Sequence, residues 1–230
     1  MDYLSIDIGG TMIKTAIIDR SGQIFEKEEF PTPKDSLEEL KCLLVRKIEK
    51  VQYQIKGIAI CVPGKVNNRI GKILVGGSLH YLNGFEMSDF IKTKFDIPVS
   101  VENDAKAAAL AELWRGTLKN KSNGILLVLG TAVGGAILYD GKIMRGSTFQ
   151  AGELSYQLTE KNHALNYQGR NLSAVRMIEE IGNILDLENP DDGVAVFKYL
   201  NNHDSRVLPV FKNYCKRLAI LINNLQVTIA

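Results

Sequence analysis

The sequence predicts an α/β fold built from two related halves, because the same hairpin pattern occurs twice. Residues 4–8 and 14–18 are short apolar runs joined by a turn with the sequence Gly-Gly-Thr. Residues 125–129 and 135–138 are again two apolar runs, and the turn between them begins with Gly-Thr. Short apolar runs bounded by glycine are typical of buried strands. We therefore expect two α/β units, each opening with an antiparallel hairpin.

An amphipathic helix should follow the first hairpin. A turn at residues 19–22 leads into a third strand at 23–25. Ser36, with Glu39 three positions later, matches a capping box, which marks the N-terminus of a helix. Leucine and isoleucine then recur at helical spacing, so we expect a helix over 36–51 that packs on the sheet.

The remainder of the first half alternates strands and helices. Residues 55–62 predict a buried strand, and residues 64–84, which are rich in glycine and asparagine, should be irregular. A short helix is expected over 88–94 and a strand over 99–101. Residues 105–113 are rich in alanine and favour a helix.

The second half continues with helices after its own hairpin. An Asp-Gly turn leads into a short strand at 142–144. Helical patterns cover 171–185 and 192–200, and a longer helix begins near Ser205. We interpret residues 226–230 as the start of a strand without a partner, so we expect the fold to continue beyond the last residue.

Composition argues against several classes of function. The chain has 230 residues and a formal net charge of +2, with 28 Lys and Arg against 26 Asp and Glu. These charges are spread along the chain, so we expect neither a nucleic-acid surface nor a membrane surface. The three cysteines stand far apart, which supports neither a disulfide framework nor a structural zinc site. The chain enters a strand almost at once and has no long apolar run, so we expect a cytoplasmic protein.

Glycines in the two hairpin turns indicate a site for phosphate groups. Glycine weakens a strand unless the backbone must adopt an unusual conformation or let a ligand approach. Backbone N–H groups in such turns form a concave anion site, to which threonine adds a hydroxyl donor. A tight hairpin alone could explain either turn, but two matched turns favour a polyphosphate held between them. The residues concerned are Gly9, Gly10, Thr11, Gly130, Thr131, Gly134 and Gly135.

A polar triplet, Glu102, Asn103 and Asp104, lies between a predicted strand and a predicted helix. Ligands bind at such positions in open α/β sheets. The helix dipole favours an ionised Asp104, which could accept a hydrogen bond from a substrate hydroxyl. The alternative is that Asp104 is only the N-cap of the helix. Asn103 either contacts a polyol through its amide or closes a turn.

Five further polar residues are candidates for the site. Glu153 and Tyr156 could hold sugar hydroxyls, although Glu153 could equally be an exposed loop carboxylate. Asp7 ends the first strand beside the glycine turn, so it could hold Mg²⁺ through water or else stabilise the turn. Lys14 and Lys106 could neutralise phosphate or simply be solvated.

Several motifs together resemble the ROK family of sugar kinases and sugar-responsive repressors. They are Asp-Ile-Gly-Gly-Thr at 7–11, Val-Glu-Asn-Asp-Ala-Lys-Ala-Ala-Ala-Leu at 101–110, Gly-Thr-Ala-Val-Gly-Gly-Ala-Ile at 130–137 and Ala-Gly-Glu at 151–153. The resemblance runs along the whole chain and implies the actin-like, hexokinase-like (ribonuclease H-like) duplicated α/β fold. We expect an N-terminal domain over 1–118 and a C-terminal domain over 119–230, with a cleft between them.

The resemblance implies that the protein phosphorylates a hexose hydroxyl with ATP. Asp104 would be the catalytic base. Asn103 and Glu153, together with Tyr156, would hold the sugar, and a segment that includes Gly77 would border it.

The same resemblance implies ATP and Mg²⁺ as cofactors. Both glycine turns would face the phosphates, helped by Lys14, and Asp7 would hold Mg²⁺ through water. The expected partners are ATP and a small sugar, and the resemblance allows a homodimer because family members are often dimers, although nothing in the sequence marks an interface.

Three departures from the family pattern narrow these expectations. Most members have His where this chain has Tyr156, followed by a cysteine-rich zinc loop that supplies a second sugar-binding Glu. Residues 157–175 contain no cysteine, so neither the zinc nor that Glu is carried over. A chain with Tyr at this position and no zinc loop resembles the β-glucoside kinase branch of the family. That branch phosphorylates the 6-hydroxyl of a glucosyl unit. Because the sequence begins directly with the first strand and not with the helix-turn-helix domain of the repressors, we do not expect DNA binding, and we expect the adenine-bordering segment to follow Ala230.

Two other functions stay open at this point. The chain could be a non-catalytic sugar sensor that uses the same pocket, but Asp104 and both glycine turns favour a kinase. It could also be another actin-like protein, such as an ATPase chaperone or a filament protein. Asn103, Asp104 and Glu153 favour a small polyol substrate instead.

Overall fold

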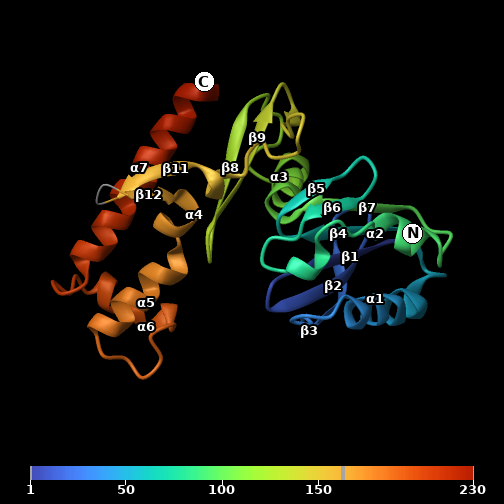
Figure 1. The fold of residues 1–230 in the computed structure, drawn as a ribbon, viewed down its shortest axis with the longest axis horizontal. Helices are drawn as coiled ribbons and strands as arrows, with labels where there is room; N and C mark the ends of the chain where they lie inside the picture. Colours follow the sequence, from blue (N-terminus) through green and yellow to red (C-terminus); the bar gives the residue numbers. More distant parts are fainter. Residues whose placement is uncertain (1, 162–163, 230) are drawn as a thin grey trace. The chain divides into compact units, whose positions relative to one another are not determined.

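The protein has two compact units, Met1–Ala108 and Ala109–Ala230, in this computed structural model, which describes residues 2–161 and 164–229. The sheet of unit 1 has five strands in the order β3-β2-β1-β4-β7, and the main sheet of unit 2 has three in the order β10-β9-β8 (Figure 1). The antiparallel set β10-β9-β8 repeats the connectivity of β3-β2-β1. The predicted duplication is therefore present in the strand order.

The sheet of unit 1 combines an antiparallel half with a parallel half. β2 pairs antiparallel with both β1 and β3, whereas β4 pairs parallel with both β1 and β7. The carboxyl ends of β1, β4 and β7 therefore meet at one edge of the sheet. The strands are β1 (Asp2–Ile8), β2 (Met12–Ile18), β3 (Ile24–Pro31), β4 (Ile55–Val62) and β7 (Val99–Asn103).

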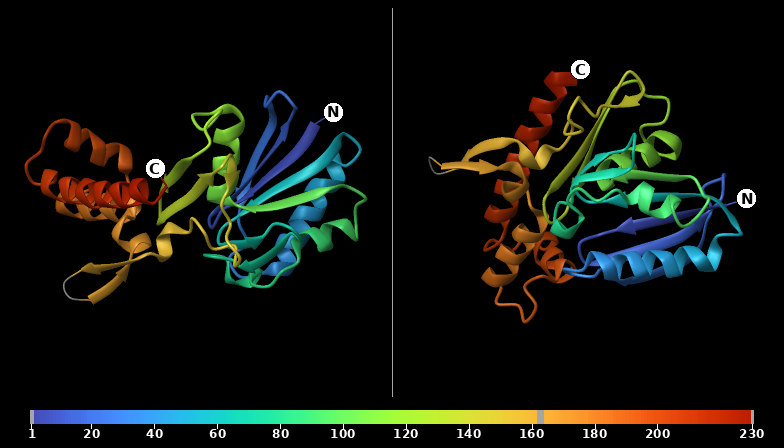
Figure 2. Two further views of the ribbon diagram at one scale, coloured as in Figure 1. Left: turned by 90° about the horizontal axis from the view of Figure 1, so that it is seen from above. Right: turned by 45° about the vertical axis from the view of Figure 1, so that its right-hand side comes forward.

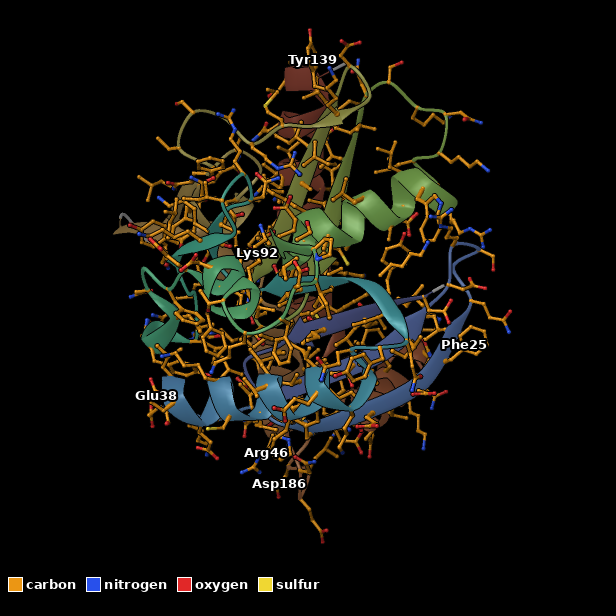
Figure 3. The ribbon with its side chains drawn as sticks, turned by 90° about the vertical axis from the view of Figure 1, so that its right-hand side faces the viewer. Phe25, Glu38, Arg46, Lys92, Tyr139 and Asp186 are labelled. Carbon is orange, nitrogen blue, oxygen red and sulfur yellow. The ribbon has the colours of Figure 1, made fainter. Side chains whose placement is uncertain are left out.

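Helix α1 (Leu37–Val51) covers the sheet of unit 1, as its apolar spacing predicts. The Ser36 Oγ accepts a hydrogen bond from the Glu39 N–H at 3.1 Å, which confirms the predicted N-cap. The outward face of the helix is polar, and Figure 3 shows Glu38 and Arg46 pointing away from the sheet. Its inward face belongs to the core of unit 1 and carries Leu40, Leu44 and Ile48.

The segment over 64–84 is more ordered than its glycine and asparagine content predicts. It forms a hairpin of β5 (Lys65–Asn67) and β6 (Lys72–Val75), followed by the 3₁₀ helix η1 (His80–Leu82). Val66, Ile73 and Leu82 are buried, so a few apolar side chains attach this segment to the core. The prediction of irregular structure was wrong, because two strands of three and four residues are too short to show alternation. The next helix, α2, spans Met87–Lys92.

The main sheet of unit 2 packs against the C-terminal half of helix α3 (Asp104–Arg115). Its strands are β8 (Gly124–Leu129), β9 (Val133–Tyr139) and β10 (Lys142–Ile143). Ala109, Ala136, Leu138 and Ile143 form a small buried cluster. Ala136 and Ala109 leave room for helix and sheet to approach closely.

The remaining helices form the larger core of unit 2. Helices α5, α6 and α7 lie together in Figure 2 and share a buried apolar cluster that includes Ile181, Val196 and Leu221. A two-stranded hairpin, β11–β12, precedes them. The elements are η2 (Leu154–Tyr156), β11 (Leu158–Lys161), β12 (Ala164–Tyr167), α4 (Gln168–Asn171), α5 (Ala174–Ile184), α6 (Gly193–Asn201) and α7 (Leu208–Ile229). The helix predicted from residue 171 begins instead after Ser173, whose Oγ caps α5.

The strand predicted over 226–230 is wrong for residues 226–229, which continue helix α7. Leu221 and Leu225 lie four residues apart on its buried face, so tertiary packing extends the helix past its apolar pattern. The Thr228 hydroxyl donates to the Asn224 carbonyl at 2.8 Å, a bond that suits a threonine inside a helix. Residue 230 lies outside the described residues. Across the described ranges, no helix has the length and apolar character needed to cross a bilayer.

Candidate active site

Three adjacent strands of unit 1 bring functional side chains together at their carboxyl ends. Asp7 on β1 is paired with Cys61 on β4, and Cys61 is paired with Glu102 on β7. Residues paired in this way share one face of a sheet, so the three side chains form a row. Glu102 is buried, whereas Asp7 and Cys61 are half-buried. The row lies where open α/β sheets bind ligands.

At the start of α3, Asn103 caps the helix and Asp104 is its first residue. The Asn103 Oδ1 accepts the Lys106 N–H at 3.0 Å, three residues on, which makes Asn103 the N-cap of the helix. Asp104 is the first helical residue, so the alternative that Asp104 is only the N-cap is wrong. The buried Asn103 also donates through Nδ2 to the Gly64 carbonyl at 2.8 Å and to Asp104 Oδ1 at 2.9 Å.

The carboxylate of Asp104 is held in place with one oxygen available. Asp104 Oδ1 accepts from the Ala105 N–H at 2.7 Å as well as from Asn103. Within the described part of the chain these bonds go to Oδ1 and none goes to Oδ2. Asp104 Oδ2 can therefore accept a hydrogen bond from a substrate hydroxyl.

The surroundings of Asp104 make it a stronger base than an ordinary carboxylate. Asp104 touches solvent, but the neighbouring atoms remove part of its hydration, and this desolvation is the main cause that raises its pKa. The negative charge of Asp7 raises the pKa further, while the bonds from Ala105 and Asn103 and the charge of Lys106 oppose the increase. A carboxylate with a raised pKa beside other polar groups is typical of a general base.

Cys61 lies between Asp7 and Glu102 in this row, and its thiol is not reactive. Its Sγ lies 3.7 Å from Asp7 Oδ1 and 3.7 Å from the Ile6 carbonyl oxygen. Desolvation, followed by the charges of Asp7 and Asp104, raises the pKa of the thiol to about 12. The protonated thiol donates weakly to Asp7 and is a poor nucleophile. The sequence offered no signal for this contact, because Cys61 occurs alone within a strand.

The first glycine turn is packed too closely to carry side chains. A Cβ on Gly9 would lie 2.9 Å from the Met12 carbonyl oxygen, and one on Gly10 would lie 2.8 Å from the Ser78 Oγ. The Thr32 hydroxyl donates to the Gly9 carbonyl at 2.7 Å and holds the turn from behind. The hydroxyl of Ser78 thus lies beside the turn, and sequence reasoning missed this residue.

The segment that contains Gly77 reaches the same edge of the sheet. Gly64 has φ of +85°, and a Cβ there would lie 2.5 Å from the Gly77 nitrogen, so the two backbones are in contact. The Asn83 Oδ1 accepts the Gly76 N–H at 2.7 Å and holds this segment in place. Because Asn103 donates to the Gly64 carbonyl, the Gly77 segment and Asp104 are linked through one short chain of contacts.

The glycines of the second hairpin, in unit 2, have different surroundings, since Gly130 lies in the turn whereas Gly134 and Gly135 lie in strand β9. A Cβ on Gly130 would meet no atom within 4 Å, and the Gly130 carbonyl accepts the Ala174 N–H of α5 at 2.9 Å. A Cβ on Gly135 would lie 2.5 Å from Leu154 Cδ1, so close packing alone explains this glycine. Thr131 is exposed in the turn, and Gly134 is paired with Val128 in the sheet.

Glu153 and Tyr156 also belong to unit 2, where Glu153 directly precedes the helix η2 and Tyr156 is its last residue. The Tyr156 N–H donates to the Glu153 carbonyl at 3.1 Å, which keeps the two residues within one helical turn. Glu153 is half-buried and Tyr156 is exposed. Leu154, between them, is buried in the core of unit 2 and fixes the position of η2.

The two candidate lysines differ from each other. Lys14 is exposed on β2 and is directly opposite Asp7 in the β1–β2 register. Lys106 is only 2% exposed, so the interpretation of a solvated lysine is wrong for this residue. The positive charge of Lys106 opposes the rise in the pKa of Asp104, less strongly than the hydrogen bonds from Ala105 and Asn103 do.

The residues around Asp7 fit a magnesium ion that arrives with phosphate groups. Mg²⁺ retains several waters and is bound by one or two carboxylates together with substrate phosphates. Asp7 provides a half-buried carboxylate beside the glycine turn, and its charge acts on Asp104, so a cation here would be attracted by both carboxylates. Among the residues that the structure describes, no cluster of three or more His, Cys, Asp or Glu is placed to hold a metal ion.

Comparison with known proteins assigns a family. The model of the ROK family matches residues 3–230. The chain is 34% identical over 162 residues to a β-glucoside kinase of Klebsiella pneumoniae, a match that covers 70% of this chain and 54% of that protein. It is 28% identical over 235 residues to an N-acetylmannosamine kinase of Haemophilus influenzae, which covers 100% of this chain and 77% of that protein. The chain spans about half the length of the β-glucoside kinases that it matches.

Solved structures show the same fold. A ROK family protein from Streptococcus pneumoniae in complex with sucrose superposes with a TM-score of 0.80 at 27% identity, covering 99% of this chain and 76% of that one. A ROK family glucokinase from Streptomyces griseus in complex with glucose and AMPPNP superposes with a TM-score of 0.82 at 20% identity, covering 100% and 80%. The actin-like, hexokinase-like α/β fold expected from the sequence is confirmed.

Proposed function

The chain belongs to the ROK family, and from that premise we propose that it transfers the terminal phosphoryl group of ATP to a hydroxyl of a hexose or β-glucoside. The proposed acceptor is the 6-hydroxyl of a glucosyl unit. The observation that carries the proposal is the state of Asp104, which has a raised pKa, a fixed orientation and one available oxygen. A residue with only a structural role would have no need of this combination.

Asp104 is the proposed general base. Its Oδ2 accepts a hydrogen bond from the sugar hydroxyl and aims the hydroxyl oxygen at the phosphorus atom. As the new P–O bond forms and the bond to ADP breaks, the hydroxyl proton passes to Asp104. Phosphoryl transfer depends mainly on positioning and charge neutralisation, and a general base contributes about 10²- to 10⁴-fold to the rate.

Asn103 has a positioning role in this proposal in addition to a sugar contact. Its Nδ2 holds Asp104 Oδ1 and the Gly64 carbonyl, and its Oδ1 caps α3. A sugar hydroxyl would therefore reach Asn103 through the second lone pair of Oδ1. Glu153 and Tyr156 are proposed to hold further sugar hydroxyls, with Gly77 at the border of the sugar.

The phosphates of ATP are proposed to contact the two glycine turns. The Gly9 N–H already donates to the Met12 carbonyl at 3.0 Å, so the backbone N–H groups proposed to face an anion in the first turn are those of Gly10 and Thr11, beside the Ser78 hydroxyl. Gly130 and Thr131 provide a second turn, with open space at Gly130 and with Gly134 near the start of β9, and Lys14 adds a positive charge near Asp7. When bound, Mg²⁺ would neutralise charge on the phosphates, and Asp7 would hold it through water.

The proposed substrate class is supported by the names of similar proteins. Relatives at 34% and 33% identity are named β-glucoside kinases, and one solved relative is in complex with sucrose, a disaccharide. Another relative is named an N-acetylmannosamine kinase. We propose a β-glucoside as the preferred substrate because Tyr156 stands where zinc-binding members have histidine. A cytoplasmic homodimer also stays a prediction.

A coupled ADP-release assay tests the proposed function. The protein would be incubated with Mg-ATP and, separately, glucose, fructose, mannose, N-acetylglucosamine, N-acetylmannosamine, cellobiose or gentiobiose. We expect turnover that depends on the sugar and is highest with a disaccharide. Highest turnover with a monosaccharide would contradict the β-glucoside preference but not the kinase. Sugar binding by calorimetry without turnover would instead identify a non-catalytic sensor.

A further inference from the structure

An exposed aromatic corner stands beside Glu153 in unit 2. The rings of Tyr156 and Tyr167 meet edge to face, with centroids 6.4 Å apart and planes at 82°. They are 48% and 56% exposed, and Leu158, the β-sheet partner of Tyr167, is 60% exposed. Paired residues of a hairpin share a face, so Leu158 lies on the same side as Tyr167. We name these three residues, Tyr156, Leu158 and Tyr167, the aromatic corner.

The aromatic corner is anchored to the core on both sides. Tyr156 ends η2, whose Leu154 is only 2% exposed. Tyr167 ends β12, and the next residue, Gln168, donates its N–H to the Gln157 carbonyl at 2.8 Å. A Cβ on Gly169 would lie 2.8 Å from the Ser155 Cβ, so α4 lies directly against η2. The two rings are thus brought together before any ligand binds, which lowers the entropy lost on binding.

The chemistry of the aromatic corner suits a sugar ring or an aryl group. The faces of tyrosine rings pack well against the C–H groups of a pyranose or against another aromatic ring, and the tyrosine hydroxyls remain in water. The corner carries no charge, which disfavours a phosphate. Gln157, between Tyr156 and Leu158, and Gln168, next to Tyr167, provide neutral amides of the kind that bind hydroxyls.

We propose that the aromatic corner binds the aglycone of a β-glucoside, either a second pyranose or an aryl group, while the glucosyl unit lies against Glu153. The inference rests on the proposed function and adds Tyr167 as a residue that determines specificity. The position of the corner supports the inference, because Tyr156 is linked by its N–H to the Glu153 carbonyl. Tyr156 in turn contacts Tyr167, so both rings lie near the turn that carries Glu153.

A matched pair of variants tests the inference. Tyr167→Ala removes a ring of the corner, whereas Tyr139→Ala removes a tyrosine of equal exposure, 55%, at the far end of β9 (Figure 3). The readout is kcat/KM for phenyl β-glucoside and for gentiobiose, each divided by kcat/KM for glucose. One aromatic contact corresponds to about three- to tenfold, so we expect Tyr167→Ala to lower both ratios by that factor. Tyr139→Ala should leave both ratios unchanged, and Tyr167→Phe, which keeps the ring, should stay within about twofold of the native ratio.

Calorimetry without nucleotide separates this inference from the proposed function. Phenyl β-glucoside should bind more tightly than glucose to the native chain, and Tyr167→Ala should remove that difference. If Tyr167→Ala removes the difference in affinity but neither the native protein nor any variant shows turnover, the aglycone site is supported and the proposed kinase activity is contradicted. If Tyr167→Ala phosphorylates glycosides with unchanged ratios of kcat/KM to that for glucose, the aglycone site is contradicted and the proposed kinase activity is not. Equal losses on glucose and glycosides would also contradict the aglycone site, because they would mean that Tyr167 only supports the hairpin.

Discussion

Asp104 combines favourable contacts with an unfavourable environment. Its Oδ1 is held by two hydrogen bonds, yet partial desolvation and the charge of Asp7 raise its pKa. Lys106 is buried two positions further along α3 and opposes that rise. A residue selected only for stability would not combine these features, because an isosteric amide could keep both bonds without the charge. Such a conflict is typical of functional residues.

Asp104→Asn should therefore stabilise the protein at neutral pH. The Asn Oδ1 can still accept from Asn103 and Ala105, while the desolvated charge is removed. A carboxyl group whose pKa is higher in the folded than in the unfolded state destabilises the fold above the folded-state pKa, and this effect vanishes below the unfolded value of ~3.9. We expect a higher Tm for the variant at neutral pH and a difference that shrinks to zero as the pH falls below that value.

The control for this measurement is Asp96→Asn, which changes an exposed carboxylate just before β7, at the opposite end of that strand. The Tm of Asp96→Asn should equal the Tm of the native protein at each pH. A lower Tm for Asp104→Asn at neutral pH would show that the charge of Asp104 stabilises the fold, which would contradict the raised pKa.

Sequence reasoning predicted Asp104 as a candidate base but did not predict the residues that hold its carboxylate. The position of Asp104 between a strand and a helix was sufficient to predict its role as a candidate. The capping role of Asn103 depends on a one-residue difference in where α3 begins, which a sequence pattern does not define. The burial of Lys106 depends on the packing of α3, and an alanine-rich helix shows no strong apolar face from which to predict it.

At the scale of elements, different constraints explain why positions 130 and 135 are both glycine. Gly135 lies in β9 against Leu154, which fixes η2 and with it Tyr156. Gly130 lies in the turn after β8, with open space where a side chain would be. The sequence grouped both as contacts for phosphate, and packing explains one of them without a ligand.

Gly135→Ala and Gly130→Ala should separate these reasons. A Cβ at Gly135 would lie 2.5 Å from Leu154 Cδ1, so we expect Gly135→Ala to lower the free energy of unfolding by about 1–3 kcal/mol. Gly130→Ala should leave the free energy of unfolding within about 0.5 kcal/mol of the native value but raise the KM for ATP. Chemical denaturation and the ADP-release assay measure the two effects. An unstable Gly130→Ala with an unchanged KM for ATP would remove this turn from the phosphate site.

The elements that the sequence predicted well are those with a strong local pattern. β4 has the bounds that were expected, and α1 begins after the expected cap. The hairpin β5–β6 was missed because each strand is very short, and the end of α7 was taken for a strand because its last residues, Gln226-Val-Thr-Ile, favour helix only through the packing of Leu221 and Leu225. Tertiary contacts decided both cases.

At the scale of the whole molecule, one structural theme is used twice. β1, β2 and β3 form the same antiparallel arrangement in unit 1 as β8, β9 and β10 form in unit 2. The sequence predicted this repetition from two glycine turns, because a tight turn between apolar strands leaves a local signal. Unit 1 alone contains Asp7, Asn103 and Asp104, which form the candidate reacting centre, whereas Glu153 and the aromatic corner belong to unit 2.

The most direct test of the central claim is to compare native protein with Asp104→Asn for sugar binding and for sugar-dependent ADP release. We predict that calorimetry will give sugar affinities within about threefold of each other, because the variant keeps the Oδ1 contacts and can still hydrogen-bond the hydroxyl. ADP release should fall by about 10²-fold or more, since the variant has no base to take the proton. Near-native ADP release by Asp104→Asn would contradict the assignment of Asp104 as the general base.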